Sequence, residues 1–132
     1  MLPWMASSRA QAVTAETLFL LNLLVLPGIA FVLLCLLWVR VRPAQPLADC
    51  HLRQTLSGSL WAGGLLVLFS SIVLFFFDYQ NPATWVFIIL YFITVHAYLV
   101  LCGAIGLAYA IAGKSFRYPI VGVDYQALEA AA

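Results

Sequence analysis

Charged residues are scarce in this sequence. Asp, Glu, Lys and Arg make up 8% of its 132 residues, against roughly 25% in a soluble domain. A soluble protein of this length must cover its surface with polar groups, and six basic and five acidic side chains cannot do so. Hydrophobic residues make up 65% of the chain, which excludes an intrinsically disordered protein. The composition therefore predicts an integral membrane protein.

Several classes of functional site are also missing. The net charge of +1 gives no basic field for nucleic acid. The three cysteines show no Cys-x-x-Cys spacing, which argues against a disulfide framework and a Cys-rich metal site. The sequence has no Gly-rich phosphate loop, His-Glu-x-x-His motif, nucleophile elbow or paired carboxylates. We therefore expect no enzymatic activity, no metal, no cofactor and no nucleic-acid partner.

Three apolar segments are long enough to cross a hydrocarbon core, which needs about 20 residues. They are Leu18–Val39, Leu56–Phe77 and Trp85–Ala112, and none contains Asp, Glu, Lys or Arg. Lipid cannot hydrogen-bond a polypeptide backbone, so each segment must be helical. The expected fold class is all-α, a single membrane domain over 1–132 with transmembrane helices at about 18–39, 56–77 and 85–112.

Local signals place the ends of the first helix. Thr14 is a candidate N-cap, with Glu16 in the first turn, where a carboxylate suits the helix dipole. Pro43 stops the helix beyond its basic end. Pro27-Gly28 falls in the middle, and Pro27 removes a backbone donor, so we expect a kink there.

The other two helices have clearer ends. Pro46 can open the second helix, whose polar first section then lies at the membrane surface. The short link after Asp78 predicts an antiparallel hairpin. Asn81 is a good N-cap with Pro82 following it, and Gly113 is the expected stop of a third helix of about 30 residues.

The distribution of Lys and Arg predicts the orientation. With three spans, the N-terminus and the link at 78–82 share one side, and their only basic residue is Arg9. The link at 40–55 and the tail at 113–132 share the other side, which the positive-inside rule places in the cytoplasm. That side carries Arg40, Arg42, Arg53, Lys114 and Arg117. We expect a multi-pass protein of the bacterial inner (cytoplasmic) membrane, with its N-terminus outside.

Two short stretches carry a resemblance to a known family. One is Asp49-Cys50-His51-Leu52-Arg53-Gln54-Thr55-Leu56, and the other is Ala112-Gly113-Lys114-Ser115-Phe116-Arg117-Tyr118-Pro119. Together with three spans, they resemble a family of small bacterial membrane proteins related to the Tic-type component of chloroplast import. That family usually has Asn where Ser57 stands here. The resemblance implies a fold and a location but no activity.

His96 is the one ionisable side chain within a predicted span, apart from tyrosines and cysteines. Intramembrane ionisable residues are functional candidates by default. His96 could bind a cofactor such as haem, could contact another subunit, or could be neutral and hydrogen-bonded between helices. No second His lies within a span to complete a haem site.

Polar and small residues in the spans indicate helix packing or contact with a partner. Tyr91, Thr94 and Tyr98 share one face of the third helix, where they predict either packing against protein or a polar path. Small residues let helices approach closely, within one chain or between chains. The predicted contact residues, besides His96, are Ser59, Gly63, Tyr91, Thr94, Tyr98, Gly103, Gly106 and Ala110.

A group of polar residues falls at the predicted cytoplasmic ends of two helices. Asp49 and Arg53 are spaced to pair on one helical face. The group could bind lipid phosphate or dock a partner, or it could tie the helix ends together. Its members are Asp49, His51, Arg53, Arg117 and Tyr118.

These features predict a non-catalytic membrane subunit that packs against, stabilises or helps assemble a larger inner-membrane complex. Its expected partners are membrane lipids and other integral membrane subunits. An oligomeric transport or translocation component is the first alternative, since three helices cannot enclose a path alone. A redox-complex anchor that uses His96 is the second.

Overall fold

The computed structural model describes residues 7–40 and 46–123. These residues form five α-helices and one π-helix, and they contain no strand. The elements are α1 (Ser8–Leu24), α2 (Ile29–Arg40), α3 (Pro46–Ala62), the π-helix η2 (Gly63–Leu68), α4 (Phe69–Phe76) and α5 (Pro82–Ile111). The all-helical fold class is therefore confirmed for the part of the chain that the structure describes.

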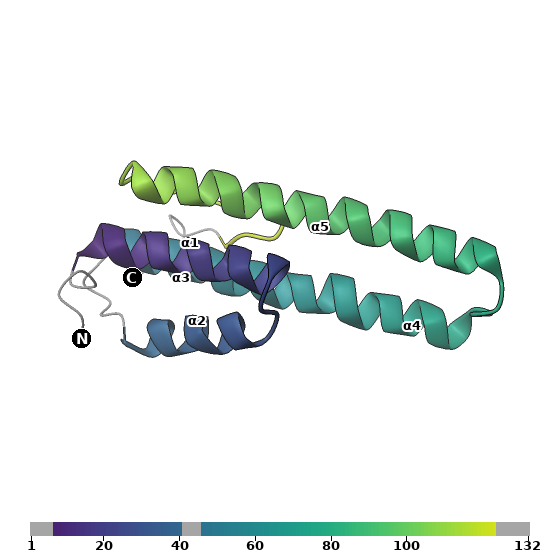
Figure 1. The fold of residues 1–132 in the computed structure, drawn as a ribbon. Coiled ribbons are helices and arrows are strands. Elements are labelled where there is room, and N and C mark those ends of the chain that lie inside the picture. The colour runs from purple at the N-terminus through teal and green to yellow at the C-terminus, as the bar shows by residue number, and fades with distance from the viewer. Residues whose placement is uncertain (1–6, 41–45, 124–132) are drawn as a thin grey trace.

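The two longest helical segments form an antiparallel hairpin (Figure 1). α3, η2 and α4 run without interruption from Pro46 to Phe76, and α5 returns over 30 residues. At 1.5 Å per residue each segment is about 45 Å long. Both are long and apolar enough to cross a membrane. Asn81 caps α5 as predicted, because its side chain accepts a hydrogen bond from the Ala83 amide at 3.0 Å.

The segment predicted as one kinked helix over 18–39 is instead a second hairpin, made of α1 and α2 (Figure 1). The prediction failed because Pro27 and Gly28 together reverse the chain rather than bend it. Pro27 lacks an amide donor, and Gly28 has a φ of 85°, in the left-handed region that glycine adopts readily. α2 has only 12 residues, about 18 Å of helix.

The predicted start of the first helix near Thr14 is also wrong. α1 begins at Ser8, because the Ser7 side chain accepts a hydrogen bond from the Ala10 amide at 3.1 Å and caps the helix about two turns earlier. Thr14 lies within the helix and bonds the carbonyl of Ala10 at 2.7 Å. Glu16 is consequently a buried residue in the middle of α1 rather than a first-turn carboxylate.

The described N-terminal and C-terminal residues lie at the same end of the molecule (Figure 1). The Ala48 amide at the start of α3 donates to the Ser8 hydroxyl at 3.0 Å. The Arg9 guanidinium lies beside Gly113 at the end of α5. The reversal at Gly28 thus returns the chain to this end once more than three straight spans would, and the expected orientation in a membrane stays a prediction.

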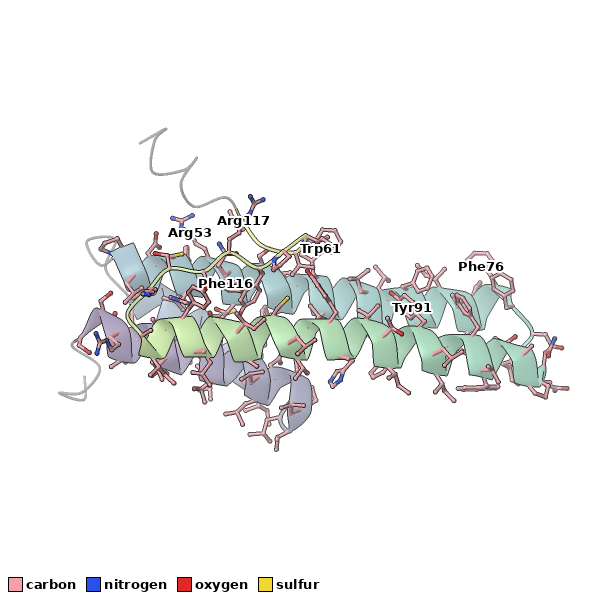
Figure 2. All side chains as sticks on the ribbon, turned by 90° about the horizontal axis from the view of Figure 1, so that it is seen from above. Arg53, Trp61, Phe76, Tyr91, Phe116 and Arg117 are labelled. Carbon is pink, nitrogen blue, oxygen red and sulfur yellow. The ribbon has the colours of Figure 1, made fainter. Side chains whose placement is uncertain are left out.

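The structure has two unlike halves. We call α1, α2, α3 and residues 97–123 the bundle end, and η2, α4 and residues 77–96 the projecting hairpin. The α1–α2 hairpin covers the bundle end alone, where α1 packs on α3 and α5 (Figure 1). Figure 2 shows Tyr91 between the two helices of the projecting hairpin and Phe76 on its outer face. Phe76 is 75% exposed, so this half leaves large apolar side chains uncovered.

The core occupies the bundle end and its boundary with the projecting hairpin. One cluster groups Phe19, Ala62, Leu66, Leu99, Cys102, Tyr118 and Val121. The other groups Ala15, Leu34, Leu37 and Leu52. Gly113 ends α5 as predicted, with a φ of 73°, and residues 114–123, the C-terminal strap, then run back over α3. Arg42, Pro43 and the rest of the predicted tail (124–132) lie outside the described residues.

Candidate functional site: a buried polar cluster

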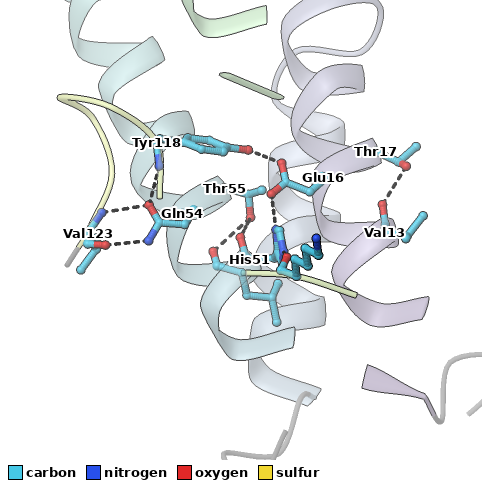
Figure 3. Close-up of polar contacts among 10 residues, drawn as sticks. Val13, Glu16, Thr17, His51, Gln54, Thr55, Tyr118 and Val123 are labelled. Carbon is cyan, nitrogen blue, oxygen red and sulfur yellow. Dashed lines mark hydrogen bonds and ion pairs between the residues drawn. The ribbon is translucent and has the colours of Figure 1, made fainter. Parts of the chain in front are cut away.

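Three polar side chains from distant parts of the sequence meet inside the bundle end (Figure 3). Glu16 comes from the middle of α1, His51 from α3 and Tyr118 from the C-terminal strap. The His51 Nδ1 lies 2.6 Å from the Glu16 Oε1, and the Tyr118 hydroxyl donates to the Glu16 Oε2. All three residues are 0% exposed. The cluster therefore joins three segments in an interior that water does not reach.

The hydrogen bonds of His51 place a hydrogen on its Nε2. Its Nε2 lies 2.9 Å from the carbonyl oxygen of Lys114, which can only accept, so Nε2 carries a hydrogen. The remaining proton lies between Nδ1 and Glu16, as an imidazolium with a carboxylate or as a neutral imidazole with a carboxylic acid. Burial raises the pKa of Glu16, although the hydrogen bonds from His51 and Tyr118 oppose the shift. Burial therefore favours the neutral pair.

Two glycines make room for this cluster. A Cβ added at Gly106 on α5 would lie 2.6 Å from the Glu16 Oε2, so only glycine lets α5 pass the carboxyl group. A Cβ at Gly58 on α3 would lie 2.9 Å from the Phe19 ring and 3.1 Å from the Tyr118 ring. The close approach of three segments around Glu16 thus depends on glycine, which has no side chain, at both positions.

The C-terminal strap is fixed to α3 by side chains that bond its backbone (Figure 3). The Gln54 Oε1 accepts hydrogen bonds from the amides of Tyr118, at 3.2 Å, and Val123, at 3.0 Å. The Gln54 Nε2 donates to the Val123 carbonyl at 2.6 Å, and Ser57 donates to the Val121 carbonyl at 2.6 Å. These bonds give an irregular segment the partners that a helix would otherwise supply.

A second feature lies where the α1–α2 hairpin ends against η2. A mainly apolar cavity of about 580 Å³ opens there, with Ser59 and His96 among its lining residues. Ser59 is 6% exposed, and its hydroxyl has no hydrogen-bond partner among the described residues. The His96 Nε2 donates to the carbonyl of Leu23 at 3.0 Å. In a continued helix that carbonyl would bond the amide of residue 27, which is proline and has none.

The predicted contact residues of the third helix do not share one environment. The Tyr91 hydroxyl donates to the Leu65 carbonyl of η2 at 2.7 Å, and the Tyr98 hydroxyl donates to the Pro119 carbonyl of the strap. Thr94 is exposed and bonds only the Leu90 carbonyl of its own helix, at 2.8 Å. The predicted polar face of the third helix is therefore not a continuous path.

The predicted small residues also separate into two groups. Gly103 and Gly106 are buried against α1, since an added Cβ would meet Leu20 at one and Glu16 at the other. Ala110 is fully buried as well. Ser59 and Gly63 instead line the cavity, and nothing lies within 4 Å of a Cβ added at Gly63. Gly63 thus offers an open small surface, whereas Gly103 and Gly106 have intramolecular partners.

The predicted cytoplasmic cluster is not one surface. The Arg53 Nε bonds the Asp49 Oδ2 at 3.0 Å, as the spacing predicted. The Arg53 guanidinium also lies 5.1 Å from the centre of the Trp38 ring. Arg117 is exposed, but His51 and Tyr118 are buried. These two therefore belong to the interior, and docking by the exposed members stays a prediction.

Sequence reasoning missed two residues that build the buried cluster. Glu16 was interpreted only as a first-turn carboxylate, and Gln54 was noted only as part of a motif. The available signal was a carboxyl group directly before the apolar run 17–39, because a buried acid needs a partner. Within residues 7–40 and 46–123, no group of three or more His, Cys, Asp or Glu side chains could hold a metal ion.

A comparison with protein families gives one match. The model of the MamF/MmsF family, described as the magnetosome magnetite crystal formation protein family, matches residues 7–123. The matched region contains all three members of the buried cluster. It also corrects the expected kinship with the Tic-type import component, which the motif stretches around His51 and Tyr118 had suggested. No curated protein and no solved structure gives a significant match.

Proposed function

Because the chain belongs to the MamF/MmsF magnetosome magnetite crystal formation family, we propose that it is a non-catalytic, multi-pass subunit of the membrane in which magnetite forms. It would act by packing against other integral membrane subunits and holding them in place. The family assignment supports a membrane-associated role in crystal formation. The step from membrane association to packing against partners rests on the exposed surface of the projecting hairpin.

The observation that carries this proposal is the uncovered surface of the projecting hairpin. The α1–α2 hairpin meets it at the boundary, where His96 bonds the Leu23 carbonyl. Farther out, Phe75, Phe76 and Leu90 are each more than 60% exposed. Gly63 and Gly64 face open space, because nothing lies within 4 Å of a Cβ added at either position. In a membrane, such open small residues let another helix approach closely.

Charge supports one orientation for this subunit. The described basic residues are Arg9, Arg40, Arg53, Lys114 and Arg117, and all five belong to the bundle end or its helix termini. The turn of the projecting hairpin carries Asp78 and no basic residue. Basic residues favour the cytoplasmic side. We therefore assign the bundle end to the cytoplasm and the Asp78 turn to the opposite compartment.

The proposal is tested by filling the open surface in the organism that makes the protein. A Gly64→Leu variant should insert normally but lose the membrane subunits that co-purify with the wild type in mild detergent. Crystals formed in those cells should differ in length from wild-type crystals by electron microscopy.

The matched control is Ala97→Leu, which adds apolar volume at an exposed position on α5. It should leave co-purification and crystal length unchanged. A Gly64→Leu protein that is inserted, retains all its partners and supports normal crystals would overturn the proposal.

A further inference from the structure

We propose that α1 and α2 form a re-entrant hairpin, which enters the lipid from the bundle end and returns to the same side without crossing. Its partner is the acyl-chain layer of that leaflet. This inference rests on the membrane placement in the proposed function, but it concerns a different part of the chain from the projecting hairpin. It replaces the transmembrane helix expected over 18–39.

Length and charge carry the first part of the argument. No Asp, Glu, Lys or Arg occurs between Glu16 and Arg40. α2 has 12 residues, so it spans about 18 Å of a hydrocarbon core about 30 Å thick. Both ends of the α1–α2 hairpin lie with the basic residues of the bundle end, where Arg9 belongs to its first turn and Arg40 ends it. The segment is apolar enough for lipid but too short to leave on the far side.

The exposed side chains of the hairpin match a lipid environment. Its turn carries Val25 at 64% exposure and Ile29 at 62%. In water these side chains would form a large exposed apolar patch, which soluble proteins rarely carry. The other large hydrophobic residues exposed on the turn and α2 are Leu24, Leu26, Val32, Leu33, Leu36 and Val39.

The strongest support comes from the backbone amides of the turn, which are hydrogen-bonded within the protein. Irregular backbone is tolerated at membrane depth only where protein groups satisfy it. The amides of Val25 and Leu26 both bond the Leu21 carbonyl, at 3.0 and 2.8 Å. The Gly28 amide bonds the Asn22 side chain at 2.9 Å. The amides of Val25, Leu26 and Gly28, which lie between the two helices, therefore all have partners, and Pro27 has no amide hydrogen.

The same turn explains both polar side chains of the apolar segments that face it. Asn22 supplies an acceptor to Gly28, and His96 supplies a donor to the Leu23 carbonyl that Pro27 leaves unpaired. A turn exposed to water would need neither side chain, because water would satisfy both groups. The geometry thus assigns Asn22 and His96 to the maintenance of a chain reversal inside lipid.

The test measures depth in purified full-length protein, reconstituted in vesicles of phosphatidylethanolamine and phosphatidylglycerol. The three native cysteines are replaced by Ala, and single nitroxide labels are placed at exposed positions of the hairpin, Thr17→Cys, Leu26→Cys and Val39→Cys. The ratio of collisions with oxygen to collisions with a water-soluble nickel chelate reports depth. We expect a maximum at Leu26 and low values at Thr17 and Val39.

A second measurement determines the side of the membrane. An impermeant thiol reagent should label Val39→Cys and Lys114→Cys from one face, and Tyr79→Cys from the other. Labelling of Val39→Cys from the Tyr79 face would show that the segment crosses, and a Leu26 label as accessible to nickel as Val39 would show that the hairpin lies in water. Either result overturns this inference while leaving the cellular test of the proposed function unaffected.

Discussion

The bundle end and the projecting hairpin are built from the same two long helices, yet they are stabilised in different ways. In the bundle end, Glu16, His51 and Tyr118 share a proton network that is 0% exposed. In the projecting hairpin, Tyr91 makes a hydrogen bond between the helices, and most large side chains face outward. One long helix can therefore belong to a protein interior at one end and present an apolar surface at the other.

The difference lies in what covers each half. α1 brings a carboxyl group against α3 and α5, where His51 and Tyr118 hydrogen-bond it and two glycines leave room for it. The projecting hairpin has no third helix, so its open positions at Gly63 and Gly64 have no intramolecular partner. Stability should therefore depend strongly on single residues in the bundle end and weakly on those in the projecting hairpin.

The largest effect is expected for His51→Leu, which leaves Glu16 buried without its nitrogen partner. Leaving a buried polar group without its partner costs about 1–3 kcal/mol, and here the Lys114 carbonyl loses its His51 donor as well. Unfolding by heat or by denaturing detergent, followed through tryptophan fluorescence, measures this loss. The double variant Glu16→Leu with His51→Leu should recover part of it, because no carboxyl group is then stranded.

The matched substitution in the projecting hairpin is Thr94→Val, which also removes a polar group. Thr94 is exposed and bonds only its own helix, so the change should stay within about 0.5 kcal/mol. Equal losses for Thr94→Val and His51→Leu would show that the two halves do not differ as described.

A smaller effect is expected when one methyl group is added to a glycine in each half. Gly106→Ala forces a Cβ to within 2.6 Å of the Glu16 carboxyl group, and such overpacking costs about 1–3 kcal/mol. Gly64→Ala meets nothing within 4 Å and should stabilise the helix by roughly 0.5–1 kcal/mol. The same unfolding assay compares the two variants. Stabilisation by Gly106→Ala would contradict the packing around Glu16, and destabilisation by Gly64→Ala would contradict the open space at Gly64.

The smallest effect is a pH dependence confined to the bundle end. Burial raises the pKa of Glu16 above its ordinary value of 4.5, so the folded protein holds this proton more tightly than the unfolded chain. The contribution of Glu16 is therefore complete below pH 4.5 and is lost as the pH rises through the folded pKa. The slope cannot exceed about 1.4 kcal/mol per pH unit, the limit for one proton.

Glu16→Gln removes the titrating group while keeping its shape. Its unfolding free energy should change less with pH than that of the wild type over the range above 4.5. Parallel pH profiles for the two proteins would mean that Glu16 titrates in the native state as it does in the unfolded chain.

The sequence predicted the long hairpin well because its signals are local. Asn81 caps α5, Pro82 follows it, and Gly113 ends it, and each of these acts through its own backbone geometry. Hydropathy likewise identified two segments long enough to cross a membrane. Such features need no knowledge of distant contacts.

The buried cluster could not be predicted because its bonds join residues far apart in the chain. Glu16 and Tyr118 are separated by 102 positions and His51 lies between them, so no periodicity connects them. The reversal at Gly28 was missed for a related reason. Pro27 permits either a bend or a turn, and the hydrogen bonds that the Asn22 oxygen accepts and that His96 donates decide between them only after the chain has folded.

The distance along the chain between Glu16 and its partners also orders events during synthesis. The carboxyl group of α1 leaves the ribosome 35 residues before His51 and 102 residues before Tyr118. Until the last part of the polypeptide emerges, α1 cannot reach its native surroundings in the bundle. Assembly of the bundle end must therefore finish after translation of α5, when the strap packs last.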